Sequence, residues 1–385
     1  MIPLAVPNLA GREREYLEEC VTSTFVSSVG PFVDRFEASV AAAAGSRGAV
    51  ATSSGTTALH LTLHCLGVRP GDLVILPSLT FIASANAIAH CGAMPWLLDV
   101  SPESWTLDPG LLTDVVRAHV DLTSSGPIHR DSGRRVAAIL PVHTLGHPAD
   151  LQPIVALGEE CGIPVVADAA AALGATYKDR PIGKLGAAAS VISFNGNKTV
   201  TAGGGGAVVS DDDCLLERAR HLSTTARTGH DYDHDEVGFN YRMTNLQAAV
   251  GCAQIEQLDT FVARKRQIHT FYREHLTALP GVSAFPQASW ASSACWFSGI
   301  VLDALRPADI AGVRERLRRA GVDARPFWKP MHLQRPFRDA PCEALPFTDA
   351  LWERVLTLPC STGITTDELS QVAELVHEVL EGATP

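Results

Sequence analysis

Short apolar strands alternate with helical segments between residues 48 and 210, and this alternation is the strongest constraint on the fold. The expected strands are Gly48–Thr52, Leu73–Leu76, Pro95–Val100, Val136–Pro141, Pro164–Asp168, Ser190–Phe194 and Ala207–Ser210. The intervening segments 56–66 and 83–90 have helical spacing. Strands interleaved with helices are typical of an α/β fold with a mainly parallel sheet. The sequence therefore predicts a sheet of seven strands.

The last two strands flank a loop that holds Lys198 and four consecutive glycines at 203–206. This loop is too short for a crossover helix, so the two strands, if they pair, are antiparallel and the sheet is mixed. Lys198 then projects at the edge of the sheet, where open α/β sheets keep their sites. Such a lysine can carry a Schiff base, bind a phosphate or simply face solvent. The glycines form either a flexible turn or a place where a ligand or another backbone comes close.

Two further features lie at the ends of expected strands. Ser53-Ser-Gly-Thr-Thr-Ala58 marks the passage from a strand to a helix. Free amides at a helix N-terminus favour a phosphate, and Gly55 lets the backbone approach it; the alternative is an ordinary capped helix start. Asp168 ends an apolar strand among small residues. A carboxylate there needs a cationic partner or serves only as a cap.

A phosphate cradle, a carboxylate at a strand end and a lysine opposite are the three groups that pyridoxal phosphate requires. The carboxylate keeps the pyridine nitrogen protonated, and the lysine forms the Schiff base. Phe81 follows the second strand and is placed to stack on the ring, although an isolated phenylalanine is more often part of a core.

The sequence resembles the DegT/DnrJ/EryC1/StrS family of pyridoxal phosphate-dependent nucleotide-sugar aminotransferases over nearly its whole length. The matching motifs are Ser54-Gly-Thr-Thr-Ala-Leu-His, Pro77-Ser-Leu-Thr-Phe-Ile-Ala, Pro141-Val-His-Thr-Leu-Gly-His-Pro148, Asp168-Ala-Ala, Ser193-Phe-Asn-Gly-Asn-Lys198 and Gly238-Phe-Asn-Tyr-Arg242. Six motifs in this order make the signal specific. Within the family the chain looks most like the 4-aminotransferases of legionaminic acid and bacillosamine pathways, and after them like the perosamine synthases.

The resemblance implies the aspartate aminotransferase-like fold, fold type I of the pyridoxal phosphate-dependent transferases, and a homodimer with shared active sites. The resemblance implies that Lys198 forms the Schiff base and transfers protons, and that Asp168 binds the pyridine nitrogen. It also implies that Phe81 stacks on the ring. The residues implied to bind the phosphate are Gly55, Thr56 and Ser193. Asn240 is implied to reach the same phosphate from the neighbouring subunit, which makes the long polar loop 223–243 an interface element. His143, Arg325 and His332 are candidates for binding the sugar or its diphosphate.

Composition is that of a globular enzyme with one large and one smaller domain. Of its 385 residues, 46% are hydrophobic and 19% are charged. The net charge of −11 does not favour binding to nucleic acid or to an anionic membrane. Neither a membrane span nor a signal peptide is apparent, so a cytoplasmic location is expected. Nine scattered cysteines without a Cys-x-x-Cys pair predict no disulfide framework, and we expect no metal site.

A change of pattern after residue 245 divides the chain. Residues 1–245 are expected to form an N-terminal arm and the large cofactor-binding α/β domain, and residues 246–385 a long helix and a small α+β domain. The helix that opens at Thr244 is expected to run to Leu276. A strand at 297–302 and helices at 308–320, 347–356 and 366–381 complete the expected small domain.

The resulting hypothesis is a transaminase that moves an amino group from L-glutamate to C4 of a nucleotide-linked 4-keto-6-deoxyhexose. The first candidate is a UDP-linked 2-acetamido sugar. Alternatives are a GDP-4-keto-6-deoxymannose 4-aminotransferase, a sugar 3-aminotransferase, and a non-catalytic regulatory protein that binds the cofactor. Ala171 stands where close relatives usually carry a polar residue, which leaves the rate and the substrate open. Relatives with histidine in place of the lysine are dehydratases, and Lys198 argues against that reaction.

Overall fold

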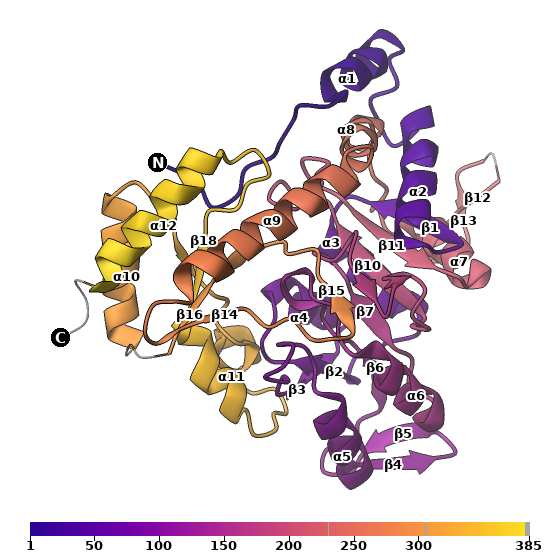
Figure 1. The fold of residues 1–385 in the computed structure, drawn as a ribbon. Coiled ribbons are helices and arrows are strands. Elements are labelled where there is room, and N and C mark those ends of the chain that lie inside the picture. Colours follow the sequence, from indigo (N-terminus) through magenta and orange to yellow (C-terminus); the bar gives the residue numbers. More distant parts are fainter. Residues whose placement is uncertain (230, 304, 306, 382–385) are drawn as a thin grey trace.

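The computed structural model describes residues 1–229, 231–303, 305 and 307–381, and Figure 1 traces the chain as a ribbon. Its larger part is built on a sheet whose strands lie in the order β1 (Gly48–Thr52), β11 (Gly206–Ser210), β10 (Ala189–Ser193), β7 (Val166–Asp168), β6 (Val136–Ile139), β2 (Leu73–Pro77), β3 (Met94–Leu98). Parallel bridges, Ile139 to Val165 and Val142 to Asp168, join its four-stranded and three-stranded halves. β11 is antiparallel to both neighbours, and the other neighbouring pairs are parallel. The expected mixed sheet of seven strands is confirmed.

Successive residues of the strands face opposite layers of helices, as the period of two in a strand requires. Val50 of β1 belongs to the core formed with α3 (Gly55–Cys65), α4 (Ile82–His90) and α7 (Asp213–Ser223). Its neighbours Ala49 and Ala51 belong to the core on the other face. That face is covered by α2 (Pro31–Ala44) and α8 (Asn245–Ile255), and further along the sheet by α5 (Pro109–His119) and α6 (Leu151–Cys161). The sequence analysis did not single out α5 and α6.

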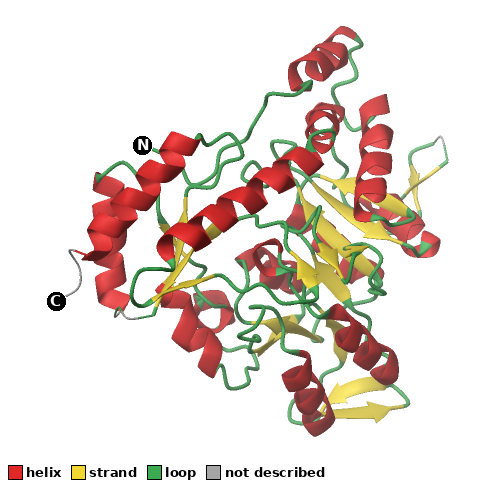
Figure 2. Cartoon of the chain, in the orientation of Figure 1, coloured by secondary structure: helices red, strands yellow, loops and turns green. Residues whose placement is uncertain are grey.

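The C-terminal part has a core and a sheet of its own. Its strands lie in the order β14 (Val282–Ala284), β16 (Ser298–Leu302), β18 (Val355–Leu358), β17 (Arg325–Pro326). The helices α9 (Leu258–Leu276), α10 (Pro307–Arg319), α11 (Pro346–Leu351) and α12 (Thr366–Glu381) belong to this part. Figure 2 shows these helices, in red, beside its strands, in yellow. The division of the chain into domains at residue 245 stays a prediction.

The single helix expected from Thr244 to Leu276 is wrong. α8 ends at Ile255 and α9 begins at Leu258, with a tightened turn in which the Gln257 amide donates to the Gln254 carbonyl at 3.0 Å. At this break the Glu256 carboxylate accepts hydrogen bonds from Tyr16 and Arg35, both at 2.7 Å. The break lets α8 pack on α1 (Glu13–Thr22) and α2, while α9 runs on to the C-terminal sheet.

The helix expected at 347–356 is also wrong, because α11 ends at Leu351 and a 3-10 turn, η4 (Trp352–Arg354), leads into β18. All four residues of β18 are buried between two strand neighbours, so this apolar run is a central strand. The remaining elements are short. They are β4 (Val120–Thr123), β5 (Gly126–His129), β8 (Thr176–Tyr177), β9 (Arg180–Pro181), β12 (Arg227–Thr228), β13 (Asp233–His234), β15 (Ala291–Ser292), η1 (Thr144–Gly146), η2 (Met331–Leu333) and η3 (Arg335–Phe337). Among the described residues, no helix combines the length and apolar character that crossing a membrane requires.

Candidate active site

A pocket of about 540 Å³ lies where loops of the large sheet meet the C-terminal part. Its walls contain most of the residues that the sequence singled out, namely Gly55, Thr56, Phe81, His143, Asp168, Ser193, Lys198 and Arg325. The strand ends of β7 and β10 and the start of α3 supply the floor. The C-terminal part adds a wall of aromatic residues around Trp296 and Trp328. The structure thus brings these distant residues to one cavity.

Lys198 stands in the loop between β10 and β11, with its Nζ 3.6 Å from the ring centre of Trp296. Its backbone amide donates to the Asn195 carbonyl at 2.9 Å, which fixes the loop. Burial lowers the pKa of Lys198 to about 8, against the opposing effect of the Asp168 carboxylate. A lysine with this pKa reaches its uncharged, nucleophilic form near neutral pH far more readily than one in water.

Asp168 closes β7 and is only 5% exposed. Its Oδ2 accepts a hydrogen bond from the Ser84 hydroxyl at 2.6 Å, and its Oδ1 accepts one from the Ala170 amide at 3.1 Å. Burial raises the pKa of this carboxyl, while the two hydrogen bonds and the charge of Lys198 act in the opposite direction. A cation placed against this carboxylate relieves the cost of burying it.

The start of α3 forms a cradle for an anion. Ser54 caps the helix by accepting from the Thr57 amide at 3.1 Å, and within the described chain the amides of Gly55 and Thr56 donate to no protein group. A Cβ on Gly55 would lie 2.9 Å from the Cβ of Ser193, so only glycine lets the Ser193 hydroxyl stand beside these amides. Free amides and hydroxyls at a helix N-terminus suit a phosphate group.

Two glycines of the run are fixed by close contacts, one with another backbone and one with a side chain. A Cβ on Gly206 would lie 2.4 Å from the Ser54 carbonyl oxygen, and one on Gly205 would lie 2.4 Å from Met243 Cε. Gly203 and Gly205 also have positive φ angles of 76° and 131°. The close approach of a backbone, one of the two interpretations left open by the sequence, therefore holds for Gly206, while Gly203 and Gly205 serve a turn with positive φ angles.

His143 carries a buried N–H group with no partner. Its Nδ1 accepts a hydrogen bond from the Ala149 amide at 3.1 Å, so the hydrogen lies on Nε2, which is bonded to no atom of the described protein. Burial and the nearby His147 lower the pKa of His143 to about 3, so the ring is neutral. Its backbone amide donates to the Asp168 carbonyl at 2.9 Å. An unpaired buried donor at a pocket wall is a place for an acceptor on a ligand.

Phe81 and Arg325 border the pocket with exposed side chains. The Phe81 ring is 53% exposed at the start of α4, with its centre 5.9 Å from that of Trp328. Arg325 forms two hydrogen bonds to the Asp323 carboxylate, at 3.0 and 2.9 Å, and this pairing raises the pKa of the arginine. Ala171 lines the same pocket and offers no polar atom beyond its backbone.

Asn240 and His332 do not line this pocket. Asn240 is exposed and bridges to Thr224 in the loop 223–243, so its expected role depends on a second subunit and stays a prediction. His332 is held outside the pocket lining, with Nδ1 2.8 Å from the Ser78 hydroxyl and Nε2 3.0 Å from the Asp349 carboxylate. The structure therefore gives His332 no direct access to this cavity.

Sequence reasoning missed Trp296 and the residues that fix it. The indole N–H donates to the Asn197 carbonyl at 2.7 Å, and the buried ammonium of Lys265 donates to the Trp296 carbonyl at 2.8 Å. The same ammonium donates to the Cys360 carbonyl at 2.6 Å. No local pattern signals these contacts, because Lys265 reads as an ordinary residue of a long helix and Trp296 as part of a core.

Comparisons with known proteins show the family of this chain. The profile of the DegT/DnrJ/EryC1/StrS aminotransferase family matches residues 7–377. The protein EpsN of Bacillus subtilis (strain 168), whose name describes a pyridoxal phosphate-dependent aminotransferase, is 37% identical over 97% of this chain and 95% of its own length. A GDP-perosamine synthase of Caulobacter vibrioides is 36% identical over 98% of both chains. The crystal structure of DesI in the presence of its TDP-sugar product is similar with a TM-score of 0.85 and 32% identity, covering 100% of this chain and 93% of that one.

Proposed function

The chain belongs to the DegT/DnrJ/EryC1/StrS aminotransferase family and is a pyridoxal phosphate-dependent sugar aminotransferase, and from this premise we propose its substrates and the roles of its residues. The reaction proposed is transfer of an amino group from L-glutamate to the 4-keto carbon of a nucleotide-linked 4-keto-6-deoxyhexose. The observation that carries the proposal is the meeting of Lys198, Asp168 and the α3 cradle in one pocket.

The residues of the pocket fit the cofactor. Lys198 binds it covalently and moves protons at the reacting carbon, since burial brings the pKa of its amine to about 8. The Asp168 carboxylate holds a protonated ring nitrogen. The amides of Gly55 and Thr56 and the Ser193 hydroxyl hold the phosphate, and Phe81 covers the ring. Bound pyridoxal phosphate supplies an electron sink that makes the proton transfer feasible.

A second subunit is part of the proposal. Asn240 is exposed on the irregular loop 223–243, so in a homodimer with shared active sites it can reach the phosphate bound by the neighbouring chain. Substitution of Asn240 by alanine should then lower the affinity for the cofactor although this residue does not line the active-site pocket of its own chain. A cytoplasmic location likewise stays part of the proposal.

Arg325 and His143 are the proposed contacts of the sugar nucleotide within the pocket. Arg325 has an exposed guanidinium at the pocket wall, which suits a diphosphate, and His143 offers its unpaired Nε2–H to an acceptor. His332 contributes only indirectly in this arrangement, by fixing the turn that follows the Arg325-Pro-Phe-Trp segment. The nonpolar Ala171 widens the pocket at a position near the substrate.

The first candidate substrate is a UDP-linked 2-acetamido-4-keto sugar, because the sequence motifs resemble those of the 4-aminotransferases of legionaminic acid and bacillosamine pathways. A GDP-linked 4-keto-6-deoxymannose is a second candidate, because a relative 36% identical over 98% of both chains is named GDP-perosamine synthase. A 3-keto sugar remains the third. These candidates differ in the base, the 2-substituent and the carbonyl position, all of which the pocket wall must distinguish.

Amination assays separate the candidates. The purified protein with pyridoxal phosphate and L-glutamate is offered each keto sugar, and the amino product is identified by mass spectrometry and by the position of the C–N bond. We expect one 4-keto substrate to give a kcat/KM at least about tenfold above the others, which corresponds to about 1.4 kcal/mol of discrimination. Binding of cofactor without any amination, with any donor, would instead support the non-catalytic alternative.

A further inference from the structure

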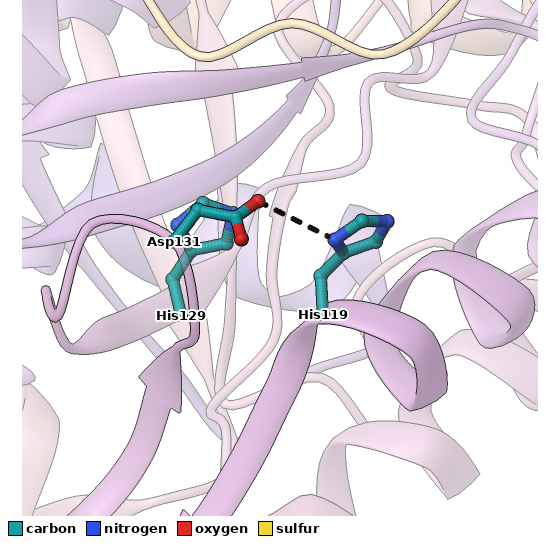
Figure 3. Close-up of side chains that lie close together, drawn as sticks. All are labelled: His119, His129 and Asp131. Carbon is teal, nitrogen blue, oxygen red and sulfur yellow. Dashed lines mark ion pairs between the residues drawn. The ribbon is translucent and has the colours of Figure 1, made fainter.

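We propose that His119, His129 and Asp131 form a binding site for one divalent transition-metal ion, with Zn²⁺ as the ion that the ligand set fits. His119 ends α5, His129 ends β5, and Asp131 stands in the turn that follows (Figure 3). One ligand atom from each of the three residues lies within 4.8 Å of the others. None of the three lines the active-site pocket, so this site is separate from the proposed chemistry.

The distance between the side-chain atoms of His119 and Asp131 fits two ligands of one metal ion better than it fits a hydrogen bond. The Nδ1 of His119 and Oδ2 of Asp131 lie 3.7 Å apart, as the dashed line in Figure 3 marks. A direct hydrogen bond is shorter than this, whereas two ligands of one tetrahedral Zn²⁺ stand about 3.4 Å apart. The Asp131 side chain is 76% exposed, so it can rotate and bring its carboxylate to the distance that a shared Zn²⁺ requires.

The backbone already holds the two histidines together. The Arg130 amide donates to the His119 carbonyl at 2.8 Å, which ties the end of α5 to the residue after β5. The imidazoles have their centres 6.3 Å apart with a 29° angle between the rings, and both pack edge-on against the buried Trp96. The ion therefore meets ligands from a helix end and a strand end that need little rearrangement, which lowers the entropy lost on binding.

His129 also has the second contact that a histidine ligand normally requires. Its Nδ1 lies 2.8 Å from the Ser132 hydroxyl, which fixes the ring orientation and leaves Nε2 without a hydrogen-bond partner among the described residues. Hydrogen bonds of this kind orient metal-binding histidines. Charge is favourable as well, because Asp131 brings a carboxylate while the neighbouring Arg130 is already paired with Asp121 at 2.7 Å.

A second group of similar composition is less suited. His221, Asp235 and Glu236 also lie close together, but His221 is bonded to Asp235 at 2.7 Å and Glu236 accepts two hydrogen bonds from Arg218 at 2.9 Å. An ion there must break three existing bonds. The cluster at His119 must give up only a long ion pair, so we place the site there, contrary to the sequence-based expectation of no metal site.

The test is a titration of the full-length protein, loaded with pyridoxal phosphate and freed of metals with a chelator, with ZnCl₂. Calorimetry should show one high-affinity Zn²⁺ per chain, and the thermal midpoint should rise with the ion, since an ion that binds only the folded state stabilises it. Mg²⁺ and Ca²⁺ should give neither effect because they prefer oxygen ligands.

Matched variants make the result specific. His119→Ala changes a half-buried side chain and Asp131→Asn an exposed one, and each should weaken Zn²⁺ binding by roughly 10- to 100-fold. The controls His275→Ala and Asp179→Asn, also exposed, should bind as the parent does. Absence of stoichiometric Zn²⁺ binding, or binding that survives both cluster variants, would overturn the proposal. The response of the cofactor spectrum to L-glutamate should be the same with and without Zn²⁺. The outcome of the Zn²⁺ test is therefore independent of the proposed function.

Discussion

The amine of Lys198 rests on the face of Trp296, with Nζ 3.6 Å from the ring centre. Trp296 belongs to the segment just before β16, in the C-terminal part, whereas Lys198 belongs to the large sheet. The contact therefore links the reactive amine to the segment that carries the aromatic wall of the pocket. An aromatic face attracts an ammonium by about 0.5 to 2 kcal/mol, so the ring favours the charged form of Lys198.

Trp296→Leu should consequently lower the pKa of Lys198 below its value of about 8, because the variant removes the group that stabilises the ammonium. A loss of about 1 kcal/mol corresponds to a fall of about 0.7 pH unit. Trp296→Phe keeps a weaker aromatic face, so in this variant the pKa of Lys198 should lie between those of the parent and of Trp296→Leu. The measurement is the rate of Lys198 acetylation against pH in cofactor-free protein, followed by mass spectrometry. An unchanged midpoint in Trp296→Leu would show that the contact is only packing.

Lys265→Met should destabilise the protein markedly although the residue lies outside the pocket. Lys265 is 3% exposed, and its ammonium donates to the carbonyls of Trp296 and Cys360. The variant removes both bonds and leaves the buried Trp296 carbonyl with only the weak contact from the Cys360 thiol at 3.7 Å. Losing such bonds costs about 1 to 3 kcal/mol each. For the two bonds, urea unfolding should therefore show a loss of about 2 to 6 kcal/mol. The control Lys178→Met, at an exposed lysine, should stay within about 0.5 kcal/mol of the parent.

Gly55→Ala should weaken pyridoxal phosphate binding at least about tenfold, or about 1.4 kcal/mol, while the protein stays folded. The added methyl group meets the Ser193 Cβ at 2.9 Å and pushes the hydroxyl away from the helix amides. A titration followed by cofactor absorbance measures the dissociation constant. Gly312→Ala is the control, since a Cβ there meets no atom within 4 Å. In a Ser193→Gly background the Gly55→Ala change should cost much less, and equal costs in both backgrounds would contradict the steric account.

Asp168→Asn should stabilise the cofactor-free protein at neutral pH while abolishing turnover. Burial raises the pKa of Asp168 above its ordinary value of 3.8, so this carboxyl destabilises the folded state progressively as the pH rises above 3.8, and in full above the raised pKa. The gain in thermal midpoint should be present at pH 7 and shrink as the pH falls towards 3.8. A variant that is less stable than the parent at pH 7 would mean that the hydrogen bonds from Ser84 and Ala170 outweigh burial.

Much of the central fold follows from local pattern. The short β-branched runs around Lys198 and the capped helix start at Ser54 are recognisable in sequence because strand propensity and capping act over a few residues. The antiparallel pairing of β10 and β11 follows from loop length alone. The positions of Asp168 and Ser193 at strand ends then follow from the sheet.

Features that depend on distant contacts could not be found in this way. Trp296 and Lys198 are separated by 98 positions, and the approach of one to the other is decided by how the two sheets pack. At the break between α8 and α9, Glu256 is hydrogen-bonded to Tyr16 and Arg35, far earlier in the chain. The run Val355–Leu358 reads as the end of a helix until β16 and β17 are known to flank it.

The most direct test of the central claim is the visible absorbance spectrum of the purified protein before and after L-glutamate is added, with Lys198→Ala measured alongside. We predict a yellow band from the lysine-bound cofactor that shifts on addition of L-glutamate in the parent and is absent from Lys198→Ala, whose unfolding midpoint stays near that of the parent. An unchanged band in Lys198→Ala, or a parent protein that develops no band even with added pyridoxal phosphate, would contradict the assignment of Lys198 as the reactive amine.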